Sequence, residues 1–205
     1  MRRFVVLLLC LCLLSGCKAS SPAETTAPTT PVTTTPVTAA TDAPTTAPEQ
    51  HYVEVSREGM TEQIPVELVQ GGCAGYTMAM DPGFFTFHPG AELDRYTYDG
   101  WYDPEGVYYT VRPISDAEAG TYVDRTLALY GERYAQVSTE SISLAGFPTT
   151  VIRMDWEQAS SGYCRHIFLL DTVEGFFVIE TQFTGEMYEG LYAIMRACFQ
   201  TFRLS

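Results

Sequence analysis

Cys164 and His166 are the residues whose types and spacing most directly suggest chemistry. Residues two apart on a strand lie on the same face of a sheet, and a thiol beside an imidazole can act as a nucleophile with its base. The strand predicted over residues 163–170 places this face against a helix, away from substrate. We therefore expect a buried histidine and an inert cysteine, with an extracellular hydrolase that uses Cys164 and His166 as the alternative.

A second candidate site is the segment of residues 92–109, which is rich in acids and aromatic rings. Its carboxylates are the hard oxygen ligands that Ca²⁺ prefers, and they belong to Asp94, Asp99, Asp103 and Glu105. Trp101 and Tyr102 could stack on sugar rings or on an apolar partner. The spacing departs from the EF-hand pattern and lacks its closing bidentate glutamate. The two interpretations are a calcium- or glycan-dependent adhesion module and an ordinary hairpin whose rings pack inward.

Most signatures of enzymes are absent from the sequence. It contains no G-x-S-x-G elbow, H-E-x-x-H pair, phosphate-binding glycine loop or C-x-x-C motif, so we expect no catalysis, no cofactor and no metal. The chain has 25 acidic and 12 basic residues, a net charge of −13. A nucleic-acid partner is not expected, because such a protein needs clustered cations to displace counterions from phosphates.

Two helices and a series of strands are expected to carry these candidates. Ser115 and Glu118 fit a capping box at the start of a helix that Gly131 ends. A second helix is predicted over residues 185–199, with a buried stripe and with Arg196 near the negative end of its dipole. Hydrophobic patterning predicts strands at residues 64–70, 75–80, 84–88, 93–98, 106–113, 138–144, 149–156, 163–170 and 176–183.

This element order predicts an α+β domain in which two helices cover one antiparallel sheet. Three segments, at residues 144–148, 175–180 and 199–203, resemble the PsbP-like α/β/α fold. That resemblance implies an accessory or binding module, and no catalytic residue of the family transfers to this chain. Cys164 and Cys198 both fall where the second helix meets the sheet, so they either form a disulfide or remain small apolar thiols.

The first residues have the features of an export signal. Arg2 and Arg3 precede an apolar run that is too short to cross a bilayer. The sequence Leu14-Ser15-Gly16-Cys17 then resembles the bacterial lipobox, in which the cysteine receives a diacylglyceryl group and cleavage occurs before it. We expect residues 1–16 to be a signal peptide and Cys17 to be the lipid attachment site.

Residues 17–50 follow as a disordered linker rich in Thr, Pro and Ala, without any aromatic residue to build a core. Residues 51–205 carry every Trp and Tyr and are expected to form a single globular domain. The sequence thus predicts an extracytoplasmic lipoprotein, anchored to the membrane through Cys17, with a non-catalytic binding or accessory domain. An envelope protein or a cell-wall glycan is the expected partner.

Overall fold

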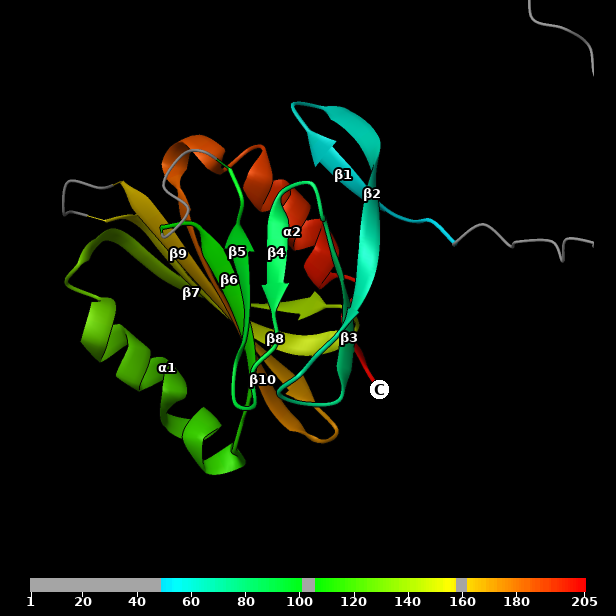
Figure 1. Ribbon diagram of the computed structural model, residues 1–205. Helices are drawn as coiled ribbons and strands as arrows, with labels where there is room; N and C mark the ends of the chain where they lie inside the picture. Colours follow the sequence, from blue (N-terminus) through cyan, green and yellow to red (C-terminus); the bar gives the residue numbers. More distant parts are fainter. Residues whose placement is uncertain (1–48, 101–105, 158–161) are drawn as a thin grey trace, which may run out of the picture. The chain divides into compact units, whose positions relative to one another are not determined.

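The structure, a computed structural model, describes residues 49–100, 106–157 and 162–205. Cys17 and most of the predicted linker lie outside these residues. The elements follow one another in the order β1 (His51–Arg57), β2 (Met60–Gln70), β3 (Tyr76–Met80), β4 (Phe85–His88), β5 (Asp94–Tyr98), β6 (Tyr108–Ile114), α1 (Asp116–Tyr130), β7 (Tyr134–Leu144), β8 (Phe147–Glu157), β9 (Tyr163–Thr172), β10 (Gly175–Thr184), the 3-10 helix η1 (Gly185–Met187), α2 (Leu191–Phe199) and β11 (Arg203–Leu204) (Figure 1).

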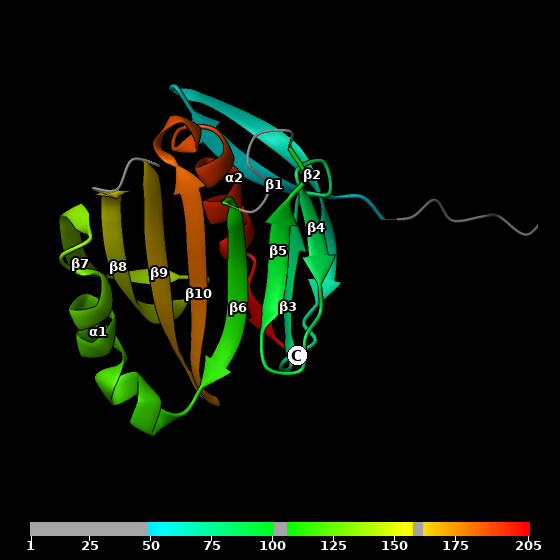
Figure 2. The ribbon, with the colours of Figure 1, turned by 60° about the vertical axis from the view of Figure 1, so that its left-hand side comes forward.

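The strands form two antiparallel sheets. The larger sheet has seven strands in the order β4-β5-β6-β10-β9-β8-β7, and the smaller has four in the order β1-β2-β3-β11. Figure 2 shows the long strands of the larger sheet side by side, with α1 lying along one of its faces. Sequential hairpins account for most of the pairs, but β6 pairs with β10 and β3 pairs with β11.

The prediction of one antiparallel sheet covered by two helices, in the PsbP-like α/β/α arrangement, is wrong. The described residues are mostly β-structure, in two sheets, with only two short α-helices. The error arose at the start of the domain, where the strand β1 and the first half of β2 were not predicted. Val53 and Val55 are buried there between exposed Tyr52, Glu54 and Ser56, so only one narrow face of the hairpin is apolar.

Helix α1 follows the prediction closely. The Ser115 hydroxyl accepts a hydrogen bond from the amide of Glu118 at 3.2 Å, which caps the first turn. The reciprocal bond of the predicted capping box is not formed in the described structure, because the Glu118 carboxylate pairs with Arg112 at 3.0 Å instead. Through Ala119 and Tyr122 the helix packs on one face of the larger sheet, where it covers a core cluster of Ile114, Ile152, Met154, Ile167, Leu169 and Val178.

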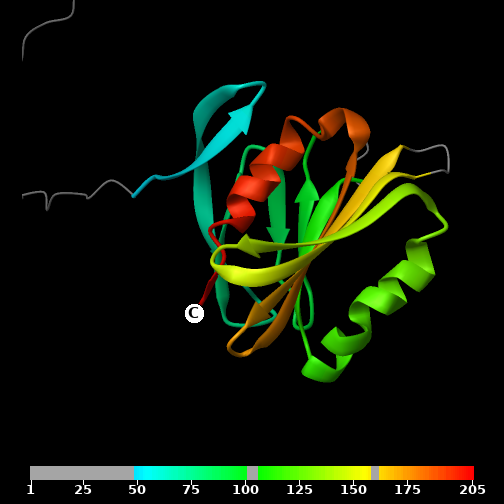
Figure 3. The same cartoon turned by 180° about the vertical axis from the view of Figure 1, so that it is seen from behind.

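Helix α2 lies between the two sheets, which explains why it has apolar residues on more than one side. Ile194 and Cys198 pack against Val53, Val55, Val66 and Ala79 of the smaller sheet. Other α2 residues join the main core cluster with the larger sheet, among them Leu191, Tyr192, Met195 and Phe199. Seen from behind, α2 crosses beside the β1 and β2 hairpin (Figure 3). The helix begins later than predicted, because η1 and a turn that ends at Gly190 occupy the expected first turns.

The predicted hairpin around Gly175 is confirmed, with Gly175 opposite Thr172 and Phe183 opposite Cys164. Strand β8 pairs with the other edge of β9, so His166 has a neighbour on each side: Arg153 on β8 and Thr181 on β10. Directly opposite residues project from the same face. The larger sheet therefore gathers polar groups on its α2 face, beneath the first turn of that helix.

Candidate functional site

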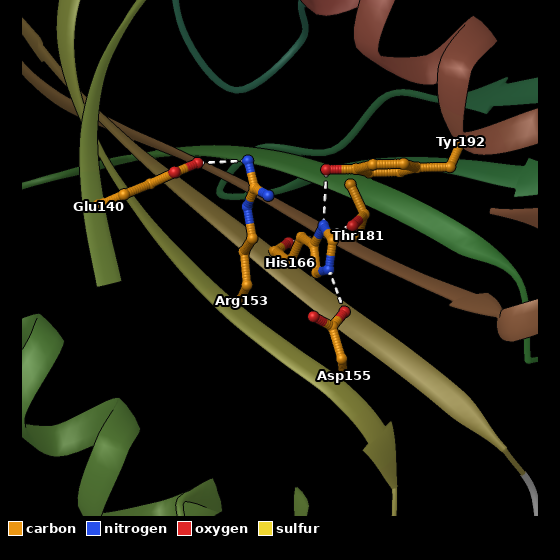
Figure 4. A network of polar contacts seen from close by, with 6 residues as sticks. All are labelled: Glu140, Arg153, Asp155, His166, Thr181 and Tyr192. Atoms are coloured by element: carbon orange, nitrogen blue, oxygen red, sulfur yellow. Dashed lines mark hydrogen bonds and ion pairs between the residues drawn. The ribbon is translucent and has the colours of Figure 1, made fainter. Parts of the chain in front are cut away.

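The predicted pair of Cys164 and His166 lies on the sheet face that α2 covers, and both side chains are fully buried. Cys164 belongs to the main core cluster. His166 Nδ1 lies 2.6 Å from the Tyr192 hydroxyl, and its Nε2 lies 2.7 Å from Asp155 Oδ1 (Figure 4). A histidine that serves as the base for a thiol needs a free ring nitrogen to accept the proton. Both nitrogens of His166 are engaged elsewhere, so the geometry argues against this nucleophile and base.

We call Asp155, His166 and Tyr192 the His166 network. Three elements position it: β8 carries Asp155, β9 carries His166 and α2 carries Tyr192. The backbone of His166 is held as well, since the Thr181 hydroxyl donates to its carbonyl at 3.1 Å. The imidazole meets the Tyr192 ring edge-on, with ring centres 4.8 Å apart. Figure 4 also shows Arg153 turned toward Glu140 on β7, with which it forms an ion pair.

His166 and Tyr192 are neutral at neutral pH. Burial lowers the pKa of His166, with Arg153 and Arg196 acting in the same direction and Asp155 opposing them. A carboxylate only accepts hydrogen bonds, so Nε2 donates to Asp155 and Nδ1 accepts from the Tyr192 hydroxyl. Burial raises the pKa of Tyr192 to about 12, which keeps the phenol protonated. Each group in the network therefore has its partner within the protein.

Tyr192, although nearly buried, also borders a surface recess. Tyr192 and Arg196, one turn apart on α2, line a recess of about 340 Å³ between that helix and the turn of the β1 and β2 hairpin. We call it the α2 recess, and its lining consists of Ser56, Arg57, Glu58, Tyr188, Glu189, Tyr192, Ala193 and Arg196. A neighbouring recess of about 430 Å³ shares three of these residues and adds the exposed Met60.

Arg196, like Arg95, Arg125 and Arg203, differs from the arginines that are held by a glutamate. Arg112, Arg153 and Arg165 are each paired with a glutamate. Among the described residues no carboxylate forms an ion pair with Arg196; its guanidinium lies over the Phe168 ring at 5.2 Å, and its Nε is buried without a hydrogen-bond partner. Sequence reasoning assigned Arg196 only to the helix dipole. The available signal was its four-residue spacing from Tyr192, which places both side chains on one side of the helix.

The predicted ligand loop is described only at its beginning. Asp99 is exposed, and its carboxylate accepts a hydrogen bond from the Thr86 hydroxyl. Trp101, Tyr102, Asp103 and Glu105 lie outside the described residues, so the calcium or glycan site stays a prediction. Within the described ranges, no three metal-binding side chains come together.

Asp94, which the sequence grouped with those acids, has a different role. It is fully buried, and its Oδ2 accepts hydrogen bonds from the amide of Gly72 at 2.9 Å, the amide and thiol of Cys73 at 3.3 and 3.2 Å, and the Tyr76 hydroxyl at 2.8 Å. Oδ1 accepts from the amide of Gly90 at 2.9 Å. Five donors leave little capacity for a cation. Asp94 therefore joins two loops to β5 as an internal anchor.

The predicted disulfide between Cys164 and Cys198 is not formed in the structure. The two residues belong to separate core clusters, because α2 directs Cys198 toward the smaller sheet while Cys164 lies on the larger one. Burial, with Asp81 nearby, raises the pKa of Cys198 to about 12. It is a small apolar residue in this setting.

Neither helix in the part of the chain that the structure describes is long and apolar enough to span a membrane.

Comparisons with known proteins add little to this description. No family model matches the chain, and no curated protein matches it significantly. Among solved structures, it is similar to a Pseudomonas aeruginosa protein of unknown function, PA94. The two are 11% identical with a TM-score of 0.40, over 66% of this chain and 94% of that one. A likeness this weak supports no inference about function.

Proposed function

We propose that this protein is a lipid-anchored, extracytoplasmic binding module whose domain recognises its partner through the α2 recess without catalysing a reaction. The observation that carries the proposal is the contrast between two neighbouring places. In the His166 network, the buried imidazole has both nitrogens satisfied, by Asp155 and by Tyr192. In the α2 recess, Glu58, Tyr188 and Glu189 are exposed to solvent.

The anchor rests on the N-terminal sequence. Leu14-Ser15-Gly16-Cys17 fits acylation and cleavage at the cysteine, and two acyl chains hold a protein on a membrane far longer than one. The linker then separates the domain from the membrane surface. A partner in the envelope, either a protein or a cell-wall glycan, is the one such a domain would meet. The excess of acids over bases gives no affinity for nucleic acid.

The hydrolase alternative has less support. Substrate would have to reach a fully buried imidazole whose two nitrogens are already engaged. The adhesion alternative around Asp99 stays open, since the residues that would carry it are not described.

Photo-crosslinking in intact envelopes tests the binding face. A benzophenone amino acid replaces Met60, which is 69% exposed beside the α2 recess, or Leu129, which is 67% exposed on α1 and serves as the matched control. We expect one adduct of defined mass from position 60, none from position 129, and loss of the first when Arg196→Gln is added. Adducts of equal yield from both positions, or none from position 60, would contradict binding at this face.

The anchor is tested separately by feeding cells radiolabelled palmitate. Label should enter the wild-type protein and be absent from Cys17→Ser, which should also leave the membrane fraction. Equal labelling of the two forms would show that Cys17 is not acylated.

A further inference from the structure

We propose that the α2 recess binds a monocarboxylate carried on an apolar or aromatic body, with Arg196 as the partner of its carboxylate. This inference rests on the proposed function and names the class of ligand at that site. It starts from the charge of Arg196, which the described residues leave without an ion-pair partner while the domain contains far more acids than bases.

A half-buried guanidinium without a carboxylate is costly, because buried charges are normally paired and buried donors normally bonded. The Nε of Arg196 is buried with no acceptor, as it also is in the ion-paired Arg153 and Arg165, but the neighbours of Arg196 are the Phe168 ring and Tyr192 rather than an acid. Arg57, the other cation of the recess, is already paired with Glu62. A ligand carboxylate in the recess would supply, at the terminal nitrogens of the guanidinium, the counter-charge that the described residues do not.

The walls of the recess favour an apolar body behind the carboxylate. The exposed ring of Tyr188 lies beside the nearly buried ring of Tyr192, with centres 5.2 Å apart, and Ala193 adds a small apolar surface. A volume of about 340 Å³ admits a small ring or a short side chain. Aromatic walls with one fixed charge are typical of sites that orient an amphipathic small molecule.

The acidic residues that line the α2 recess favour a ligand with a single negative charge. Glu58 and Glu189 both line the recess. Each would repel a second charge on the ligand, while the first is compensated by Arg196. A phosphate dianion is therefore disfavoured relative to a carboxylate of the same size. Arginine matches carboxylate geometry through paired N–H donors, which adds direction to the attraction.

The test uses the purified full chain and three probes: phenylacetate, its neutral analogue phenylacetamide, and inorganic phosphate. Titration calorimetry should show saturable binding of phenylacetate at one site, with phenylacetamide and phosphate at least about tenfold weaker, the factor expected when one charge-assisted pair is lost. Arg196→Gln should weaken the binding of phenylacetate by a similar factor. Arg203→Gln is the matched control. Among the residues that the structure describes, Arg203 donates only to local backbone carbonyls, so this change should leave phenylacetate binding unchanged.

Ser56→Asp keeps the test valid if Arg196→Gln perturbs packing on Phe168. Ser56 is exposed on β1 and lines the recess, so an added carboxylate there should repel phenylacetate without disturbing the core. Equal affinity for the amide, preference for phosphate, or unchanged binding in Ser56→Asp would each overturn the inference. If no probe binds but position 60 still crosslinks, the ligand class is wrong and the proposed function stands. If both fail, the proposed function fails as well.

Discussion

Replacement of the buried Asp94 by asparagine should destabilise the domain strongly, although the two side chains have nearly the same shape. The carboxylate receives five donors from two loops and from Tyr76. Asparagine has one acceptor oxygen and a nitrogen that only donates. In its best orientation the amide oxygen keeps the four donors of Oδ2, and its nitrogen then faces the amide of Gly90.

The expected loss follows from these contacts. The Gly90 amide would be left unsatisfied, at a cost of about 1–3 kcal/mol. The two shortest bonds to Oδ2, from Gly72 and Tyr76, would change from charge-assisted to neutral, at about 1 kcal/mol each. The free energy of unfolding should therefore fall by roughly 3–5 kcal/mol, against a total of about 5–15 kcal/mol for typical domains.

Urea unfolding of the wild type and Asp94→Asn, at several pH values, measures this loss. Burial alone would raise the pKa of Asp94, but the donors from Gly90, Tyr76 and Cys73 outweigh it and leave the pKa lowered. A carboxyl group with a lowered folded pKa stabilises the protein above its unfolded pKa of about 3.9. That contribution is lost as the pH falls through the folded pKa. The difference in the free energy of unfolding between wild type and Asp94→Asn should be constant from about pH 5 to 8 and should become smaller below about pH 4.

Asp99→Asn is the matched control for this experiment. Asp99 is exposed and contacts the Thr86 hydroxyl, so its change should stay within about 0.5 kcal/mol. A loss below about 1 kcal/mol for Asp94→Asn at pH 7, or a gap that widens on acidification, would refute the role given to this carboxylate.

Three further predictions concern the core and the His166 network. Phe202→Ala should lower the free energy of unfolding by about 3–5 kcal/mol, because the ring is fully buried among other aromatic side chains; a loss under about 1 kcal/mol would contradict that packing. Because burial lowers the pKa of His166, wild-type stability should decline as the pH falls below about 6.5, the ordinary pKa of histidine, and His166→Gln should flatten that decline in denaturant titrations. Burial and the adjacent carboxylate raise the pKa of Cys73 to about 12; a maleimide followed by mass spectrometry should still label this half-buried thiol first, with Cys164 and Cys198 reacting only on unfolding. Rapid native labelling of Cys164 would place it outside the core.

Local signals in the sequence were sufficient for the elements that depend on near neighbours. The side chain of Ser115 caps α1 as expected, and the glycine at position 175 marks the turn of the β9 and β10 hairpin. Alternation along β9 also placed His166 on the buried face. In each case the structure depends on residues that are close together in the sequence, so the local sequence pattern is enough to predict it.

The arrangement of the sheets and the site depend on contacts that no local pattern encodes. Whether β10 pairs with β6, or β11 with β3, is decided by the packing of the whole domain. The partners of His166 lie 11 residues before it and 26 residues after it, on different elements. That no carboxylate among residues 49–100, 106–155 and 162–205 pairs with Arg196 can be seen only in the folded structure.

The position of α2 has a consequence for how the chain acquires its structure. The residues from Leu191 onward supply the layer that separates the two sheets and the strand that completes the smaller one. A growing polypeptide therefore cannot close the interior of this domain until residues 191–204 have been synthesised. Until then its apolar strand faces remain exposed to chaperones, and the unfolded chain can still pass through a narrow translocation pore. Deleting the last turn of α2 should prevent the domain from folding. Shortening the linker of residues 17–50 should not.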